Sequence, residues 1–188
     1  MTTLAPPAHP VTITGRRVVL RDFVPGDLEA TMAIVGDPEV TRSLSFDTRT
    51  EAEQAQRLAD DIERARSVPR PDYYLAVVVA GTDALIGFVR IGLGTHRSGE
   101  LGYAIRKDHW HRGYATEAAG AMVDFAFTEL GLHRVAAATG PDNAASRAVL
   151  ERLGFRYEGR MRDHVFTNGA WRDSLLYAAL HHEWRSRN

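Results

Sequence analysis

The chain contains no cysteine among its 188 residues. Disulfide bonds, thiolate metal sites and a cysteine nucleophile are therefore excluded. Net charge is also small, because 23 basic and 24 acidic residues leave a formal net charge of −1. A nearly neutral chain has no general electrostatic attraction for nucleic acid or anionic lipid, so any anion-binding site must be local.

Long apolar runs are missing as well. Stretches such as YYLAVVVA fall far short of the ~20 residues that cross a membrane. The N-terminal MTTLAPPAHP has no basic start followed by an apolar segment, so no export signal is expected. We expect a cytoplasmic protein with a flexible tail over residues 1–14 and a single domain over residues 15–188, a length that suits one hydrophobic core.

The first half of the chain predicts a strand, two helices and then three strands. Residues 16–23 indicate a strand, and residues 28–36 indicate a helix that Asp37-Pro38 ends. Thr50 and Glu53 have the spacing of a capping box at the start of an amphipathic helix. Short, turn-rich separators then predict an antiparallel meander of three strands over 73–79, 85–93 and 100–106.

The second half alternates helical and extended patterns. From Ala115 to Leu130 the apolar residues follow the i, i+3, i+4, i+7 spacing of a helix, and residues 133–139 read as a buried strand. Asp142 offers an N-cap to a helix over residues 143–153. The dipeptide Asn168-Gly169 is typical of a hairpin turn between strands 155–166 and 170–180. The predicted fold class is α/β, a mixed and mostly antiparallel central sheet flanked by helices.

The stretch WHRGYA, Trp110 to Ala115, leads into the long helix. First-turn amides of a helix lack intrahelical partners and carry the positive end of the macrodipole, so they can bind an anion. Gly113 lets a ligand approach the backbone, and His111 and Arg112 can add charge. A helix that only packs against a sheet can begin in the same way, and the G-x-x-x-x-G-K-[ST] phosphate motif is absent.

Three longer segments carry a resemblance to a known family. The chain resembles the GNAT superfamily of N-acetyltransferases, and within it the ribosomal-protein N-terminal acetyltransferase-like branch, from Val18 to Leu180. The segments are ELGYAIRKDHWHRGYATEAAGAMVDFAF, NAASRAVLERLGF and EGRMRDHVFTNGAWRDSLLYAAL. The resemblance implies a splayed strand pair that holds acetyl-CoA as co-substrate. No metal ion is expected, because the eight histidines show no H-E-x-x-H pattern with a third ligand.

The resemblance also implies coenzyme-binding residues. The family's pyrophosphate loop, Gln/Arg-x-x-Gly-x-Gly/Ala, matches Trp110 to Ala115 with tryptophan in the first position. Asn143 matches an asparagine that reaches the coenzyme, although it could only cap a helix, and Ser146 matches a serine near the sulfur, although it could face solvent. The backbone groups implied to bind the coenzyme are Tyr103, Ala104 and Ile105 for pantetheine, and His111, Arg112, Gly113, Tyr114, Ala115 and Thr116 for pyrophosphate.

Acyl transfer from a thioester to an amine needs a base and a donor for the leaving thiolate. Glu100 is the first candidate for the base, although it could be an ordinary exposed strand end, and Asp163 and His164 are held in reserve. Many superfamily members have a tyrosine where this chain has Leu150. Ser146 is therefore the expected partner of the thiolate.

We expect an N-acetyltransferase that transfers acetyl directly to a primary amine in a ternary complex. An α-amine, with a pKa of about 8 against about 10.4 for lysine, favours a protein or peptide N-terminus as acceptor. A small-molecule amine, such as an antibiotic or metabolite, and a non-catalytic acyl-CoA sensor are the alternatives. The acceptor is expected between residues 37–50 and 165–171. The expected partners include no nucleic acid or membrane, and the protein is a monomer or a homodimer.

Overall fold

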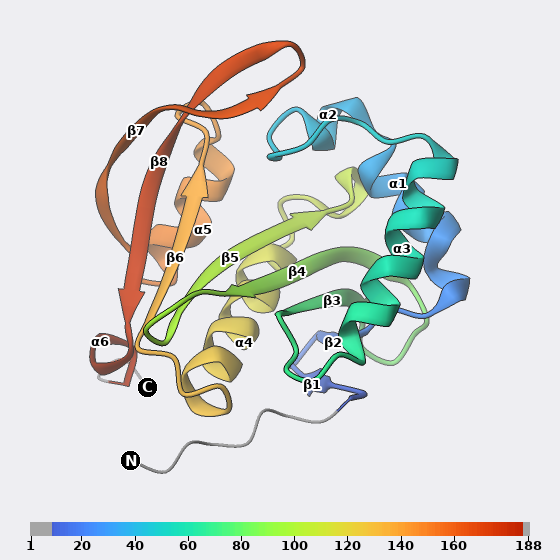
Figure 1. Ribbon diagram of the computed structural model, residues 1–188, viewed down its shortest axis with the longest axis horizontal. Coiled ribbons are helices and arrows are strands. Elements are labelled where there is room, and N and C mark those ends of the chain that lie inside the picture. The colour runs from blue at the N-terminus through green and yellow to red at the C-terminus, as the bar shows by residue number, and fades with distance from the viewer. Residues whose placement is uncertain (1–8, 186–188) are drawn as a thin grey trace.

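The computed structural model describes residues 9–185, and its strands form one eight-stranded sheet in the order β1-β2-β3-β4-β5-β6-β8-β7 (Figure 1). Neighbouring strands are antiparallel except β5 and β6, which are parallel. The strands are β1 (Thr12–Thr14), β2 (Val18–Asp22), β3 (Asp72–Val79), β4 (Leu85–Leu93), β5 (Ser98–Ile105), β6 (Arg134–Thr139), β7 (Arg156–Thr167) and β8 (Ala170–Leu180).

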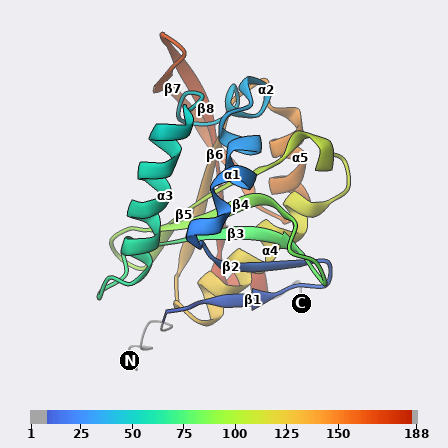
Figure 2. The same ribbon diagram turned by 90° about the vertical axis from the view of Figure 1, so that its right-hand side faces the viewer.

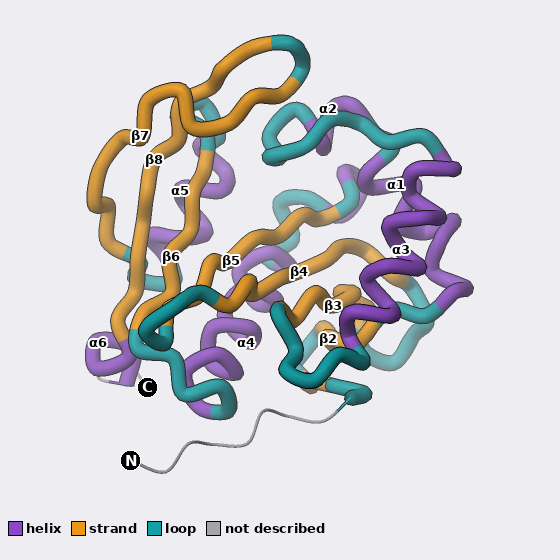
Figure 3. Tube along the Cα trace, viewed as in Figure 1, coloured by secondary structure: helices purple, strands orange, loops and turns teal. Residues whose placement is uncertain are grey.

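Helices cover the two faces of the sheet unequally (Figures 2 and 3). The larger core cluster lies between the sheet and α4, and a smaller cluster lies under α1 and α3 on the other face. The α-helices are α1 (Leu28–Val35), α2 (Pro38–Thr41), α3 (Glu51–Ala65), α4 (Tyr114–Thr128), α5 (Ala144–Arg152) and α6 (His181–Arg185), and the 3-10 helices are η1 (Pro25–Asp27) and η2 (Lys107–His109). None of the helices in the described part of the chain is long and apolar enough to cross a bilayer.

The predicted α/β class and the antiparallel meander are confirmed. Strands β3, β4 and β5 pair in sequence order, and β5, α4 and β6 form the parallel crossover. The capping box of α3 is present, since Thr50 N–H donates to Glu53 Oε2 at 2.8 Å and Glu53 N–H donates to Thr50 Oγ1 at 3.3 Å. Asn168 and Gly169 both have positive φ, at 52° and 71°, as a tight hairpin turn requires.

Two local predictions were wrong. The flexible tail predicted over residues 1–14 is too long, because β1 pairs with β2 and Val11 is buried. Residues 1–8 of that prediction lie outside the described residues. The N-cap of α5 is Asn143 rather than Asp142, since its Oδ1 accepts the Ser146 N–H at 3.0 Å. The prediction that α1 ends at Asp37-Pro38 is confirmed, and Asp37 in addition caps the short helix α2 by accepting the Glu39 N–H.

Candidate active site

The sheet opens between its two parallel strands. Within residues 9–185, β5 and β6 pair only from Ser98↔Arg134 to Leu101↔Ala137. Beyond that point β5 continues to Ile105 along β4, and β6 continues to Thr139 along β8. Figure 1 shows the two strands diverging. The result is a gap, here called the β5/β6 gap, in which two strand edges face each other without ladder hydrogen bonds.

Backbone direction decides which residues offer polar groups to this gap. Arg106 N–H donates to the carbonyl of Ile86 in β4 at 2.7 Å. Because backbone groups alternate along a strand, Tyr103 and Ile105 turn theirs toward the gap, whereas Ala104 turns its own toward β4. The expectation that the Ala104 backbone pairs with a ligand in the gap is therefore wrong.

Trp110 makes a contact that the family pattern does not predict. Its indole Nε1–H donates to the Ile105 carbonyl at 2.6 Å, which joins the loop before α4 to the end of β5. The Ile105 carbonyl is consequently already bonded within the chain. Tyr103 N–H, Tyr103 C=O and Ile105 N–H are the remaining groups of this edge that can pair with a bound ligand.

The start of α4 lies just beyond the gap. Gly113 is its N-cap, with a φ of 78°, and no described side chain caps the helix there. The first-turn amides of Tyr114, Ala115 and Thr116 consequently have no partner within their own helix. His111, which has a φ of 60°, and Arg112 are exposed in the loop before it. This arrangement suits an anion held by backbone N–H groups and the helix dipole.

Arg17 braces this helix start, and sequence reasoning missed it. Its backbone N–H and its Nε–H donate to Glu117 at 2.5 and 2.7 Å, and Nη1–H donates to the Arg112 carbonyl at 3.0 Å. Its guanidinium also lies over the Tyr114 ring, 5.2 Å from the centroid. Burial raises the pKa of Glu117, but the hydrogen bonds from Arg17 outweigh it and hold that pKa below its ordinary value. The brace therefore joins the β1–β2 turn to the loop before α4.

A partly buried pair of hydroxyl groups joins β5 to α5. The Tyr103 hydroxyl lies 2.9 Å from Ser146 Oγ and 3.3 Å from the Ser146 carbonyl. Burial raises the pKa of Tyr103 to about 12, although the hydrogen bond with Ser146 acts to lower it. Leu150 is 1% exposed, so this position of α5 belongs to the core. Asn143 caps α5, the structural alternative that the sequence left open for it.

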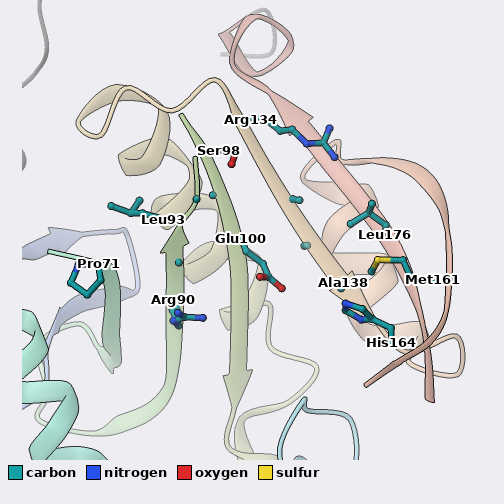
Figure 4. Close-up of a pocket in the computed structure, with 15 residues that line it drawn as sticks. Pro71, Arg90, Leu93, Ser98, Glu100, Arg134, Ala138, Met161, His164 and Leu176 are labelled. Atoms are coloured by element: carbon teal, nitrogen blue, oxygen red, sulfur yellow. The ribbon is translucent and has the colours of Figure 1, made fainter. Parts of the chain in front are cut away.

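The Glu100 side chain lies on the face of β5 opposite to that of Tyr103, where it lines a cavity of about 460 Å³ (Figure 4). His164 from β7 lines the same cavity, and its Nδ1 forms a hydrogen bond with Ser174 Oγ at 3.0 Å. Arg90 from β4 also lies there, with its Nε bonded to Asp72 at 2.8 Å. The structure thus brings Glu100 and His164 to one cavity and places Tyr103 and Ser146 on the other side of the sheet.

A family model described as acetyltransferase (GNAT) domain matches residues 17–156. The N-acetyltransferase YoaA of Bacillus subtilis is 31% identical over 166 residues, covering 87% of this chain and 93% of YoaA. The [ribosomal protein uS5]-alanine N-acetyltransferase of Escherichia coli is 32% identical over 97 residues, which are 52% of this chain and 50% of that enzyme. Among solved structures, Mycobacterium smegmatis RimJ in complex with CoA-disulfide has a TM-score of 0.81 at 25% identity, with 97% of each chain covered.

The matching family model and the N-acetyltransferase relatives identify the chain as an acyltransferase. The chain belongs to the acetyltransferase (GNAT) family, and its activity is that of an N-acetyltransferase.

Proposed function

We propose that the protein transfers the acetyl group of acetyl-CoA directly to a primary amine, and that the acceptor is the N-terminus of a protein or peptide. Residues 15–188 would act as one catalytic domain. The observation that carries the proposal is the β5/β6 gap, which leads from a free strand edge to the uncapped start of α4.

Acetyl-CoA has the chemistry that this gap requires. The amide-rich pantetheine arm can pair with Tyr103 and with the Ile105 N–H as an added strand would. Its pyrophosphate can accept hydrogen bonds from amides between His111 and Thr116, where the helix dipole favours negative charge. Arg17 adds a guanidinium beside this site, since its Nη1 bonds to the Arg112 carbonyl.

The acceptor amine would reach the thioester from the cavity on the opposite face of the sheet. Its nitrogen attacks the carbonyl carbon, the C–S bond breaks, and the electron pair of that bond leaves on sulfur. Glu100 is exposed to this cavity and would take the amine proton through an ordered water, with His164 as the reserve base. A backbone N–H at the gap edge, from Tyr103 or Ile105, would donate to the developing oxyanion.

Ser146 would donate to the leaving thiolate from the other side of the gap. Its hydroxyl is held at 2.9 Å from Tyr103, on the face of β5 away from Glu100. The base and the donor would therefore approach the thioester from opposite faces of β5. This suits a ternary complex in which the amine attacks from one side and the thiolate leaves on the other. No covalent enzyme intermediate is needed.

An N-terminal acceptor is favoured by two observations. The E. coli relative is named for acetylation of an alanine of ribosomal protein uS5, and the solved relative is RimJ. The hairpin tip lies against the segment after α2, with Asn168 N–H bonded to Asp47 Oδ1 at 2.8 Å, and these are the two segments expected to border the acceptor. A small primary amine is the second candidate, because a cavity of about 460 Å³ is in the range of small-ligand sites.

Thiol release from acetyl-CoA across an amine panel tests the proposal. The panel contains peptides with free and blocked N-termini, lysine-containing peptides with blocked N-termini, and small amines. We expect release to depend on a free peptide α-amine. Thiol release with small amines alone would make a small amine, and not a peptide N-terminus, the acceptor. Tight binding of acetyl-CoA without thiol release for any amine would contradict catalysis.

A further inference from the structure

The contact between Tyr103 and Ser146 is more specific than packing requires. Tyr103 stands on β5 and Ser146 in the first turn of α5, 43 residues apart in the chain, yet their hydroxyl oxygens lie 2.9 Å apart. The Tyr103 hydroxyl also reaches the Ser146 carbonyl at 3.3 Å. Two acceptors on one residue give the phenol hydrogen two positions, and only one of them leaves the Ser146 hydrogen free.

The two hydrogen-bond arrangements differ in what Ser146 can do. When the phenol donates to the Ser146 carbonyl, the Ser146 hydroxyl can donate back to the phenol oxygen. When the phenol donates to Ser146 Oγ instead, the serine hydrogen is free to point elsewhere. A negative charge next to Ser146 favours the second arrangement, because it attracts that hydrogen.

We propose that Tyr103 is a positioning residue, whose phenol donates to Ser146 Oγ as the C–S bond of the thioester breaks and so directs the Ser146 hydroxyl hydrogen toward the departing sulfur. This inference rests on the proposed acetyl transfer. The Tyr103 side chain does not touch the reacting atoms and acts through Ser146, whatever the backbone of Tyr103 binds. The sequence reasoning used only its backbone, and no tyrosine side chain occupies the α5 position held by Leu150.

The pair acts without losing a proton. Burial raises the pKa of Tyr103 to about 12, whereas an ordinary thiol has a pKa of about 8.5. A proton on the phenol therefore stays there when a thiolate forms nearby. The C–N bond to the amine forms and the C–S bond breaks, the electron pair of the C–S bond remains on sulfur, and both O–H bonds of the Tyr103–Ser146 pair persist while they stabilise that charge by hydrogen bonding.

Tyr73 provides a matched control for removing a tyrosine hydroxyl. It lies on β3 in the same core cluster, is fully buried, and its hydroxyl has no hydrogen-bond partner among the described residues. Its ring packs on Phe125 at 5.1 Å between centroids, a contact that phenylalanine keeps. Tyr73→Phe therefore removes the same atom from the same core without affecting Ser146.

The test is a double-mutant cycle on steady-state acetyl transfer, with the acceptor amine found for the wild-type protein. We expect Ser146→Ala to lower kcat about 100-fold and Tyr103→Phe to lower it about 10-fold, as loss of a donor to a developing charge does. KM for acetyl-CoA should change less than about twofold in both. In the Ser146→Ala background, Tyr103→Phe should cost nothing further, and Tyr73→Phe should keep the wild-type kcat.

Two results would overturn the inference while leaving acetyl transfer intact. One is a wild-type kcat for Tyr103→Phe. The other is a loss from Tyr103→Phe that remains about 10-fold in the Ser146→Ala background, which would show a merely structural role. An inactive wild-type protein with every amine would instead contradict the proposed function on which the inference rests.

Discussion

Gly113→Ala is the substitution that most sharply separates backbone strain from loss of the coenzyme site. Gly113 has a φ of 78°, and a left-handed conformation costs a residue with a Cβ about 1–2 kcal/mol. The added Cβ would also lie 3.2 Å from Arg17 Nη2. Since Arg17 is tied to Glu117 and to the Arg112 carbonyl, moving it weakens hydrogen bonds worth about 1 kcal/mol.

Gly169→Ala is the matched control. Gly169 has a φ of 71°, so alanine suffers the same kind of strain, but none of the described atoms lies within 4 Å of the added Cβ. We expect a loss of unfolding free energy of about 2–3 kcal/mol for Gly113→Ala and about 1–2 kcal/mol for Gly169→Ala. In a chain of this size each kcal/mol lowers Tm by about 2–4 °C, so thermal unfolding resolves the two.

Coenzyme affinity, measured by titration calorimetry with acetyl-CoA, carries the functional part of this prediction. Gly113→Ala should raise Kd at least about tenfold, equivalent to about 1.4 kcal/mol, because the methyl group and the displaced Arg17 disturb the amides that bind pyrophosphate. Gly169→Ala should leave Kd unchanged. Equal affinities for Gly113→Ala and the wild type would refute the assignment of the α4 start as the pyrophosphate site.

Three further predictions address the base, the core and the brace. Glu100→Gln should lower kcat by about 10²-fold or more and leave the Kd of acetyl-CoA unchanged; an unaltered rate in the thiol-release assay would remove Glu100 from the mechanism. Arg70→Met should lower the unfolding free energy in urea by about 3–5 kcal/mol, because it removes the buried guanidinium that pairs with Asp22, where the two side chains are 5% and 6% exposed; a loss below about 1 kcal/mol would contradict this. The pKa of Glu117 is lowered in the folded state, so the stability it provides is complete above its ordinary pKa near 4.5 and is lost as the pH falls below it. The stability difference between the wild type and Glu117→Gln should therefore narrow from about pH 6 to about pH 3, and a widening difference would reverse the sign of this linkage.

Local patterns predicted most of the elements because each has a local physical cause. The helical spacing of apolar residues in α4 follows from one face packing on the sheet. The start of α3 follows from a capping box confined to four residues. Asn168-Gly169 marked its hairpin because only such residues adopt positive φ readily. The predicted N-cap of α5 was one residue too early. Asp142 and Asn143 are both good N-cap residues, and only the backbone conformation selects between them.

The contacts that shape the candidate site could not be read from the sequence. The Arg17–Glu117 brace joins residues 100 positions apart, and the Tyr103–Ser146 contact depends on how α5 lies against β5. The register of β5 with β4 decides which residues of β5 turn their backbone groups toward the β5/β6 gap, and it turns those of Ala104 away from it. Trp110 stood out as a departure from the family pattern, but its bond to Ile105 requires the loop conformation.

The most direct measurement is a crystal structure of the protein with coenzyme A bound. We predict that the pantetheine arm lies between β5 and β6 and bonds to Tyr103 backbone groups, that pyrophosphate oxygens lie within about 3 Å of the amides at the start of α4, and that the sulfur lies near Ser146. Density for coenzyme A outside the β5/β6 gap, or pyrophosphate away from the α4 start, would contradict the proposed site.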